Sequence, residues 1–199
     1  MKLGAVILAA GLSTRMGGFK PLLELDGQAM LLREIGLLLS SGLHQVVVVS
    51  GNRHEDVCRC LSVLPQYGRE VQVAHNREFE AGMFSSVLTG VRALAETIES
   101  FYLLPADCPG VTLRTLLDLG EAMVQGGWEV VYPVVQGRRG HPPLISCTVL
   151  SRLEQWQGEG GLKAFLRTCE GTEVAVEDRN ILNDLDTPTD LLRFLAAQA

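Results

Sequence analysis

The sequence opens with a continuous apolar run, residues 4–10, that leads into a polar loop containing three glycines, residues 11–20. Such a run is typical of a strand buried on both faces of a parallel sheet, because helices cover both sides of these sheets. Further strand candidates follow at residues 46–49, 71–74, 101–104, 130–135 and 173–176. Segments with helical patterns separate most of them. This alternation predicts right-handed βαβ units and a three-layer α/β fold, with helices on both faces of a mainly parallel sheet.

The helices are predicted over residues 28–39, 56–61, 85–96, 112–124 and 161–168, and after Pro188. Gly42 is placed to end the first of them, and Ser85 or Ser86 to cap the third. The sequence contains no internal repeat, low-complexity segment or linker composition. We therefore expect residues 1–199 to form a single domain.

Charge and composition exclude several classes of partner. The chain carries 17 Lys and Arg against 23 Asp and Glu, a net charge of −6. This balance argues against a protein that grips a nucleic acid through its whole surface, but a small polyphosphate needs only a few local cations. No apolar run reaches the roughly 20 residues of a membrane span. Five cysteines without a CxxC pair indicate reduced thiols and a cytoplasmic protein. The oligomeric state is left open.

The loop after the first predicted strand carries the strongest local signal. Ligands of open parallel sheets bind outside the carboxyl ends of the strands. The small residues Ala9, Ala10 and Gly11 allow close backbone approach, Arg15 can hold phosphate oxygens bidentately, and Lys20 offers a mobile charge. Neither a Walker A loop nor Gly-x-Gly-x-x-Gly is present, which disfavours a plain dinucleotide binder. The alternative is a glycine-containing surface turn with two solvated cations.

Two acidic positions are candidate metal ligands. Asp107 lies in a turn after the strand at residues 101–104, and Mg²⁺ is commonly held by one or two carboxylates together with phosphates. The alternative for Asp107 is a turn residue that caps residues 111–115. Asp184 and Asp186 precede Thr187 and Pro188, a plausible helix start, where negative charge is stabilising whatever the function.

Several segments together resemble a known family. Residues 8–20 (LAAGLSTRMGGFK) resemble the LAAGxSxRMGxxK signature of MobA-like NTP transferases, nucleotidyltransferases that activate small metabolites. Residues 76–86, 104–109, 140–142 and 183–191 resemble the family's NPxxxxGMxxS, LPADxP, GHP and NDxDTPxDL segments, in the same order. The resemblance covers nearly the whole chain and implies a Rossmann-like nucleotidyltransferase fold. Ala9-Ala10 resembles the molybdenum cofactor cytidylyltransferase subgroup, since the related guanylyltransferases typically have LAGG.

The resemblance also implies roles for individual residues. It places Arg15, Lys20 and Asp107 in catalysis, and it places Asp107 and Asp184 at Mg²⁺, with Asp184 favoured over Asp186. The nucleotide-binding residues that it implies are Leu8, Ala9, Ala10, Gly11, Lys20, Asn76, Gly82 and Ser86. The simpler interpretation of Gly82 and Ser86 is a helix start. Arg77 stands where the family usually has proline, and Phe79 where it often has tryptophan.

A later loop, residues 137–143, concentrates two cations and a histidine. In the cytidylyltransferase subgroup this loop faces the acceptor, so the resemblance implies that Arg138 or Arg139 holds an acceptor phosphate and that His141 orients it. The alternative is a solvated surface loop.

The reaction implied is an in-line displacement, in which an acceptor phosphate oxygen attacks the α-phosphorus of CTP and pyrophosphate leaves. Ser13 has no adjacent base, so no protein nucleophile is expected. Molybdopterin is the favoured acceptor. Alternatives are GTP with molybdopterin, a sugar phosphate or methylerythritol phosphate as acceptor, and a non-catalytic module that assists maturation of a molybdoenzyme. A molybdoenzyme or an accessory protein is the further candidate partner.

Overall fold

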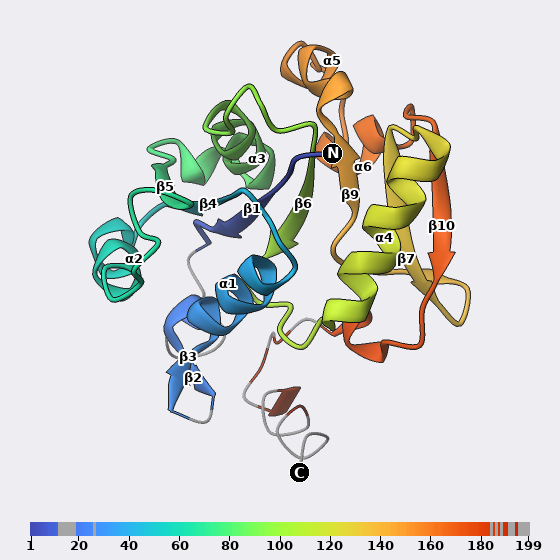
Figure 1. The fold of residues 1–199 in the computed structure, drawn as a ribbon. Coiled ribbons are helices and arrows are strands. Elements are labelled where there is room, and N and C mark those ends of the chain that lie inside the picture. The colour runs from blue at the N-terminus through green and yellow to red at the C-terminus, as the bar shows by residue number, and fades with distance from the viewer. Residues whose placement is uncertain are drawn as a thin grey trace.

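One large sheet forms the centre of the molecule (Figure 1). The computed structural model describes residues 1–11, 19–25, 27–183, 185, 187, 189–190 and 194. The sheet has eight strands in the order β10-β7-β9-β6-β1-β4-β5, with β8 paired to β7 outside this path. Its strands are β1 (Leu3–Ala9), β4 (Gln45–Ser50), β5 (Val71–His75), β6 (Ser100–Pro105), β7 (Val130–Val135), β8 (Arg138–Arg139), β9 (Leu144–Ser146) and β10 (Gly171–Ala175).

Most strand pairs in this sheet are parallel. β1 pairs in parallel with β4 on one side and with β6 on the other, β4 with β5, and β7 with β10. The antiparallel pairs involve β8 and β9, two strands that the sequence pattern did not predict. β9 lies between β6 and β7, and β8 pairs with β7. The expected mainly parallel α/β sheet is confirmed. A small antiparallel hairpin of β2 (Glu24–Leu25) and β3 (Gln28–Ala29) stands apart from it.

Helices cover both faces of the sheet (Figure 1). The α-helices are α1 (Met30–Ser40), α2 (His54–Leu61), α3 (Met83–Arg92), α4 (Leu113–Gly126), α5 (Leu150–Glu154) and α6 (Gly161–Leu166). Short 3₁₀ helices are η1 (Lys20–Leu22), η2 (Phe79–Ala81), η3 (Cys147–Val149) and η4 (Arg179–Leu182). Apolar residues of α1, α2 and α4 share one buried cluster, and those of α3, α5 and α6 share another.

Alternation along the strands explains the two buried clusters. In β4, Val46 and Val48 contribute to the cluster under α1, whereas Val47 and Val49 contribute to the cluster under α3. Successive strand residues point to opposite faces, so a run of buried valines is the pattern of a strand covered on both sides. All six residues of β4 are buried. These β-branched residues also favour the extended backbone.

The order of the strands determines where a ligand can bind. From β1 the chain continues to β4 and β5 on one side, and it then crosses to β6 on the other side of β1. The direction of winding therefore reverses at β1. In open α/β sheets such a reversal leaves a crevice at the carboxyl ends of the strands, where ligands bind.

Two local predictions differ from the structure. The third helix begins at Met83, and its N-cap is Gly82, at φ 102°, so neither Ser85 nor Ser86 is the cap. The first helix begins at Met30, because residues 28–29 form β3. Gly42 follows α1 at φ 84°, the left-handed conformation expected of a helix end. The helix predicted after Pro188 lies largely outside the described residues.

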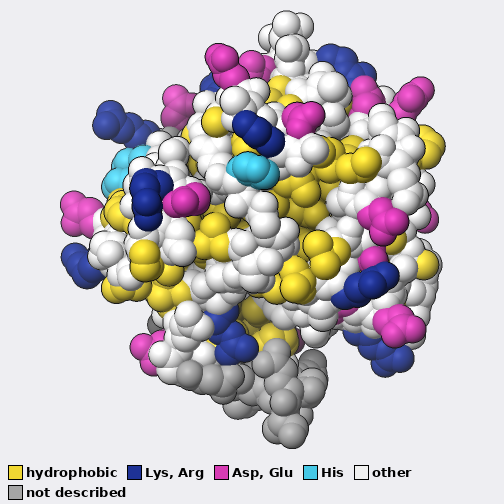
Figure 2. Space-filling model, viewed as in Figure 1, with side chains coloured by type: hydrophobic (Ala, Val, Ile, Leu, Met, Phe, Trp, Pro, Cys, Tyr) yellow, Lys and Arg dark blue, Asp and Glu magenta, His cyan; other side chains and the backbone are white. Residues whose placement is uncertain are grey.

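The surface gives two further facts. On the face shown in Figure 2, Lys and Arg side chains are scattered among Asp and Glu, and apolar side chains gather near the middle. None of the helices in the described part of the chain combines the length and apolar character that a bilayer crossing requires.

Candidate functional site

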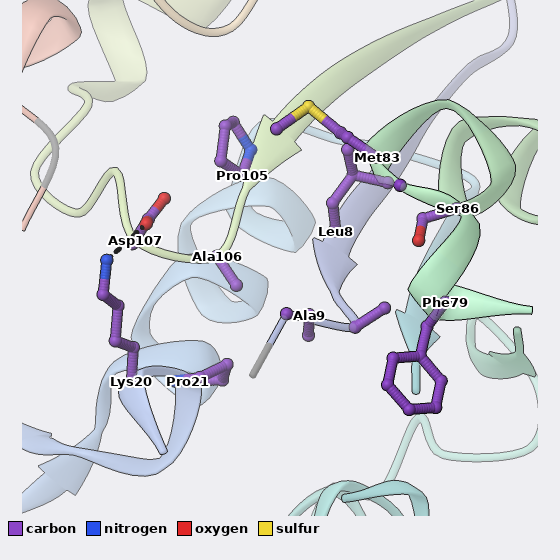
Figure 3. Close-up of a pocket in the computed structure, with 13 residues that line it drawn as sticks. Leu8, Ala9, Lys20, Pro21, Phe79, Met83, Ser86, Pro105, Ala106 and Asp107 are labelled. Carbon is purple, nitrogen blue, oxygen red and sulfur yellow. Dashed lines mark hydrogen bonds and ion pairs between the residues drawn. The ribbon is translucent and has the colours of Figure 1, made fainter. Parts of the chain in front are cut away.

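A cavity of about 220 Å³ lies at the carboxyl ends of β1 and β6, where the winding of the sheet reverses (Figure 3). Its walls come from the segment after β1, from η1, from the segment that joins η2 to α3, and from the turn after β6. The lining residues are Leu8, Ala9, Ala10, Gly11, Lys20, Pro21, Phe79, Gly82, Met83, Ser86, Pro105, Ala106 and Asp107.

An ion pair occupies one end of this cavity. Lys20 Nζ lies 2.9 Å from Asp107 Oδ2, and the two side chains are 11% and 27% exposed. The N–H of Ala106 donates to the carbonyl of Leu8 at 3.1 Å, which ties the turn that carries Asp107 to the end of β1. The structure therefore brings a cation and a carboxylate together beside small residues that leave the backbone accessible.

The C-terminal segment reaches the same turn. The N–H of Leu185 donates to the carbonyl of Asp107 at 2.8 Å. Asp184, the predicted second metal ligand, lies outside the described residues, and so does Arg15. Their roles stay predictions.

Ser86 marks the opposite end of the cavity, near Phe79 (Figure 3). The side chain of Asn76 donates from Nδ2 to Ser85 Oγ at 2.8 Å and to Ser86 Oγ at 3.0 Å. Asn76 Oδ1 accepts the backbone N–H of Glu78 at 2.9 Å, which fixes the orientation of the amide. This network holds the segment that leads from β5 to α3 in one shape.

The same network determines whether the Ser86 hydroxyl acts as a donor or as an acceptor toward the cavity. Its oxygen already accepts a hydrogen bond from Asn76, so its proton is available to an acceptor atom in the cavity. Asn76 itself is 3% exposed and does not line the cavity. Its amide thus contacts the Ser86 hydroxyl, which faces the cavity, and the nucleotide contact that the resemblance implies for Asn76 stays a prediction.

The predicted acceptor residues lie elsewhere. Arg138 and Arg139 form β8, and neither they nor His141 line the cavity. Arg139 Nε lies 2.7 Å from Glu173 Oε1 on β10, and its guanidinium lies 4.2 Å from the ring centroid of Tyr132. The backbone N–H of His141 donates to the carbonyl of Ile181 at 2.8 Å. Arg139 is thus held on the sheet by its ion pair and its ring contact.

Sequence reasoning missed two features of this region. Phe79 lines the cavity, although the motif comparison singled it out only as a departure from tryptophan. Glu34 lies on the buried face of α1, and within the described residues neither of its carboxylate oxygens has a hydrogen-bond partner. Burial raises the pKa of the Glu34 carboxyl well above its usual value, and the negative charge of Asp107 adds to the effect. An acid among the apolar positions of α1 was the available sequence signal.

The donor set was tested for a divalent cation. Within the described residues, no three His, Cys, Asp or Glu side chains gather closely enough to hold a metal ion. Asp107 is a single carboxylate facing a cavity beside a cation. That arrangement suits Mg²⁺, which keeps waters and takes phosphate oxygens as further ligands, and it does not suit zinc.

The fold and the cavity define a Rossmann-like α/β protein with a cavity at the topological switch point, where ligands of such sheets bind. A protein of Mycobacterium tuberculosis H37Rv, solved as a complex with manganese, shares this fold with a TM-score of 0.75. The two are 22% identical, and the match covers 99% of this chain and 100% of that one.

Sequence comparison identifies the family. Residues 5–174 match the MobA-like NTP transferase domain, so the chain belongs to the MobA-like NTP transferase family, which confirms the resemblance seen in the motifs. The molybdenum cofactor cytidylyltransferase of Escherichia coli K12 is 26% identical over 189 residues, 94% of this chain and 92% of the relative. The nicotine blue oxidoreductase of Paenarthrobacter nicotinovorans is 28% identical over 200 residues, 96% of this chain and 95% of the relative.

Proposed function

We propose that the protein transfers the cytidylyl group of CTP to the phosphate of molybdopterin and releases pyrophosphate. The observation that carries this proposal is the two-ended cavity of an NTP transferase. One end holds the Lys20–Asp107 ion pair, and the other holds the Ser86 hydroxyl with its proton available. A nucleotide needs this combination, with charge at its phosphates and a directed hydrogen bond at its base.

The base end fits cytosine chemically. The O2 and N3 atoms of cytosine accept hydrogen bonds, and Ser86 presents a donor. The backbone of Ala9, Ala10 and Gly11 lines the same cavity, where small side chains permit close approach to a base edge. We therefore propose Ser86 and this segment as base-binding groups, with Gly82 beside them and Asn76 as the residue that positions Ser86.

The phosphate end carries the chemistry. An oxygen of the acceptor phosphate attacks the α-phosphorus of CTP, and the bond from that phosphorus to the oxygen bridging to the β-phosphate breaks. Lys20 neutralises charge on the oxygens around the α-phosphorus, and Arg15 grips the triphosphate. Asp107, with Asp184, is proposed to hold Mg²⁺, which supplies charge neutralisation across the phosphates when bound. The acceptor phosphate is already ionised near neutral pH, so these groups need no general base.

The acceptor is the less constrained substrate. Arg138 remains exposed on β8, and we propose that it contacts the acceptor together with Arg139 and His141. The ion pair of Arg139 with Glu173 would have to open or be shared with the acceptor phosphate. We also propose that residues 1–199 act as one domain, since one sheet takes strands from Leu3 to Ala175.

A second candidate is an oxidoreductase, favoured by the full-length similarity to the Paenarthrobacter enzyme. The cavity itself supports group transfer, because an ammonium and a carboxylate meet where phosphates would lie. A non-catalytic nucleotide binder is the third possibility. All three make different predictions about turnover.

Pyrophosphate release should be measured with each of the four NTPs and Mg²⁺, with and without molybdopterin and with a panel of sugar phosphates. We expect release with CTP only when molybdopterin is present, and a loss of at least about 100-fold in Asp107→Asn. Asp118→Asn is the matched control, because Asp118 is 24% exposed and pairs with Arg114 on α4. CTP binding without turnover would favour the accessory module, and NAD(P)H oxidation would favour the oxidoreductase.

A further inference from the structure

A second cavity, of about 320 Å³, lies at the same edge of the sheet beyond β4 and β5. Gly51, Asn52, His54 and His75 are among the residues that line it. The rings of His54 and His75 stack with their centroids 4.1 Å apart, and Ser50 Oγ lies 2.7 Å from His54 Nδ1. Nothing in the proposed transfer reaction uses this cavity.

A thin wall separates the two cavities. Gly51 lines the second cavity, whereas Ala10 and Phe79 line the first. A Cβ atom added at Gly51 would lie 2.6 Å from the carbonyl oxygen of Ala10 and 2.9 Å from Phe79 Cβ. The backbone of Gly51 therefore packs directly against these two residues, and Phe79 contributes an aromatic ring to the first cavity at this wall.

Phe79 stands at the base end of the first cavity. In Figure 3 its ring lies below Ser86, on the opposite side of the cavity from Lys20 and Asp107. A base that accepts a hydrogen bond from Ser86 would therefore lie close to this ring. A pyrimidine has one ring to fit there, whereas a purine has a second ring directed at the wall.

The wall is held in place from behind. Phe79 is the first residue of η2, and the N–H of the preceding residue, Glu78, donates to Asn76 Oδ1. Ser85 Oγ donates to the carbonyl of Glu78, and the N–H of Gly82 to the carbonyl of Phe79. The side chain of Phe79 also packs against the apolar cluster under α3. A side chain held in this way rejects a larger ligand by steric conflict, because it cannot move aside cheaply.

We propose that Phe79 is the specificity-determining residue for the size of the base, closing the nucleotide cavity against purines and keeping the second cavity out of reach. This inference rests on the proposed function for its orientation of the nucleotide. Removing the ring would enlarge the base end of the nucleotide cavity and let a purine extend further toward Gly51.

The test compares CTP and GTP binding at equilibrium in the wild-type protein and in Phe79→Ala and Phe79→Leu, by calorimetry with Mg²⁺ present. Phe84→Ala is the matched control, because Phe84 is also half-buried, packs in the same apolar cluster and does not line the cavity. We expect the ratio of CTP to GTP affinity to fall at least about 10-fold in Phe79→Ala, less in Phe79→Leu, and not in Phe84→Ala.

Each outcome decides the inference. An unchanged ratio in both Phe79 variants, an equal change in Phe84→Ala, or a wild-type protein that binds GTP better than CTP would overturn it. Phe79→Leu keeps an apolar side chain in the cluster and so keeps the test open should Phe79→Ala fail to fold. The readout is binding, so a wild-type protein that selects CTP through Phe79 yet transfers nothing would refute the proposed function and leave this inference standing.

Discussion

The buried carboxyl of Glu34 gives a quantitative test of the structure. Glu34 is 5% exposed, and neither of its carboxylate oxygens has a hydrogen-bond partner in the part of the chain that the structure describes. A buried polar group in that condition costs about 1–3 kcal/mol even when neutral. We expect Glu34→Met, which keeps an unbranched side chain of similar length, to increase the free energy of unfolding by about 1–4 kcal/mol at pH 7.5. For a chain of this size, each kcal/mol raises Tm by about 2–4 °C.

The raised pKa of Glu34 determines how the free energy of unfolding changes with pH. In the unfolded chain, Glu34 loses its proton near the ordinary value of 4.5, whereas burial and Asp107 keep the proton bound in the folded protein to a higher pH. The unfolded state therefore binds fewer protons in this window, and stability falls as the pH rises from 4.5 toward the raised pKa. Each unit of the pKa shift costs about 1.4 kcal/mol. The advantage of Glu34→Met should be smallest below pH 4.5 and should grow above it.

Urea unfolding followed by circular dichroism, from pH 4 to pH 8.5, measures both quantities. Glu121→Met on the exposed face of α4 is the control, and we expect it to change stability by less than about 0.5 kcal/mol. Destabilisation of the protein by more than about 1 kcal/mol in Glu34→Met would reveal a stabilising partner for the carboxylate and contradict this prediction. A difference in unfolding free energy between Glu34→Met and the wild type that stays constant across the pH range would contradict it equally.

Three further predictions concern the cavity and the packing beneath it. Ser86→Ala should raise the KM for CTP about 3–10-fold with little change in kcat, because a single uncharged hydrogen bond is lost; an unchanged KM in steady-state assays would contradict the base contact. Lys20→Met should increase the affinity for Mn²⁺ without nucleotide about 10-fold in calorimetric titrations, because no ammonium then competes at the Asp107 carboxylate; weaker Mn²⁺ binding would refute that competition. Gly90→Ala should destabilise the protein by about 1–3 kcal/mol, since its Cβ would lie 2.4 Å from a valine methyl of β1, whereas Gly36→Ala, with open space, should stabilise it by about 0.5–1 kcal/mol; equal effects in thermal melts would contradict the packing.

The sequence predicted the parallel strands well because their signal is local. The four valines of β4 and the apolar run of β1 each specify a strand covered on both faces without knowledge of the rest of the chain. β9 was missed because Leu144–Ser146 is too short to show a pattern, and only its neighbours β6 and β7 make it a strand. The prediction that Ser85 or Ser86 caps α3 was wrong, because Gly82 at φ 102° is the N-cap and the helix begins earlier.

The position of the candidate site could be predicted from the sequence, but the contacts among its side chains could not. Lys20 and Asp107 follow neighbouring strands, so their meeting at one sheet edge follows from the topology. The hydrogen bond from Asn76 to Ser86 could not be predicted in this way, because a motif does not show which of its side chains contact one another. The ion pair of Arg139 with Glu173 joins β8 to β10, residues too far apart in the sequence for pattern reasoning to pair them.

The position of β1 in the sheet has a consequence for synthesis. β1 is synthesised before both of its partners, β4 and β6, and β6 ends at Pro105. Until β6 has emerged from the ribosome, one edge of this apolar strand has no partner in the sheet, and non-local pairing of this kind is slow. The cavity that joins Leu8 to Asp107 cannot exist on a shorter nascent chain. The cavity therefore forms only after β6 and the turn that carries Asp107 have been synthesised.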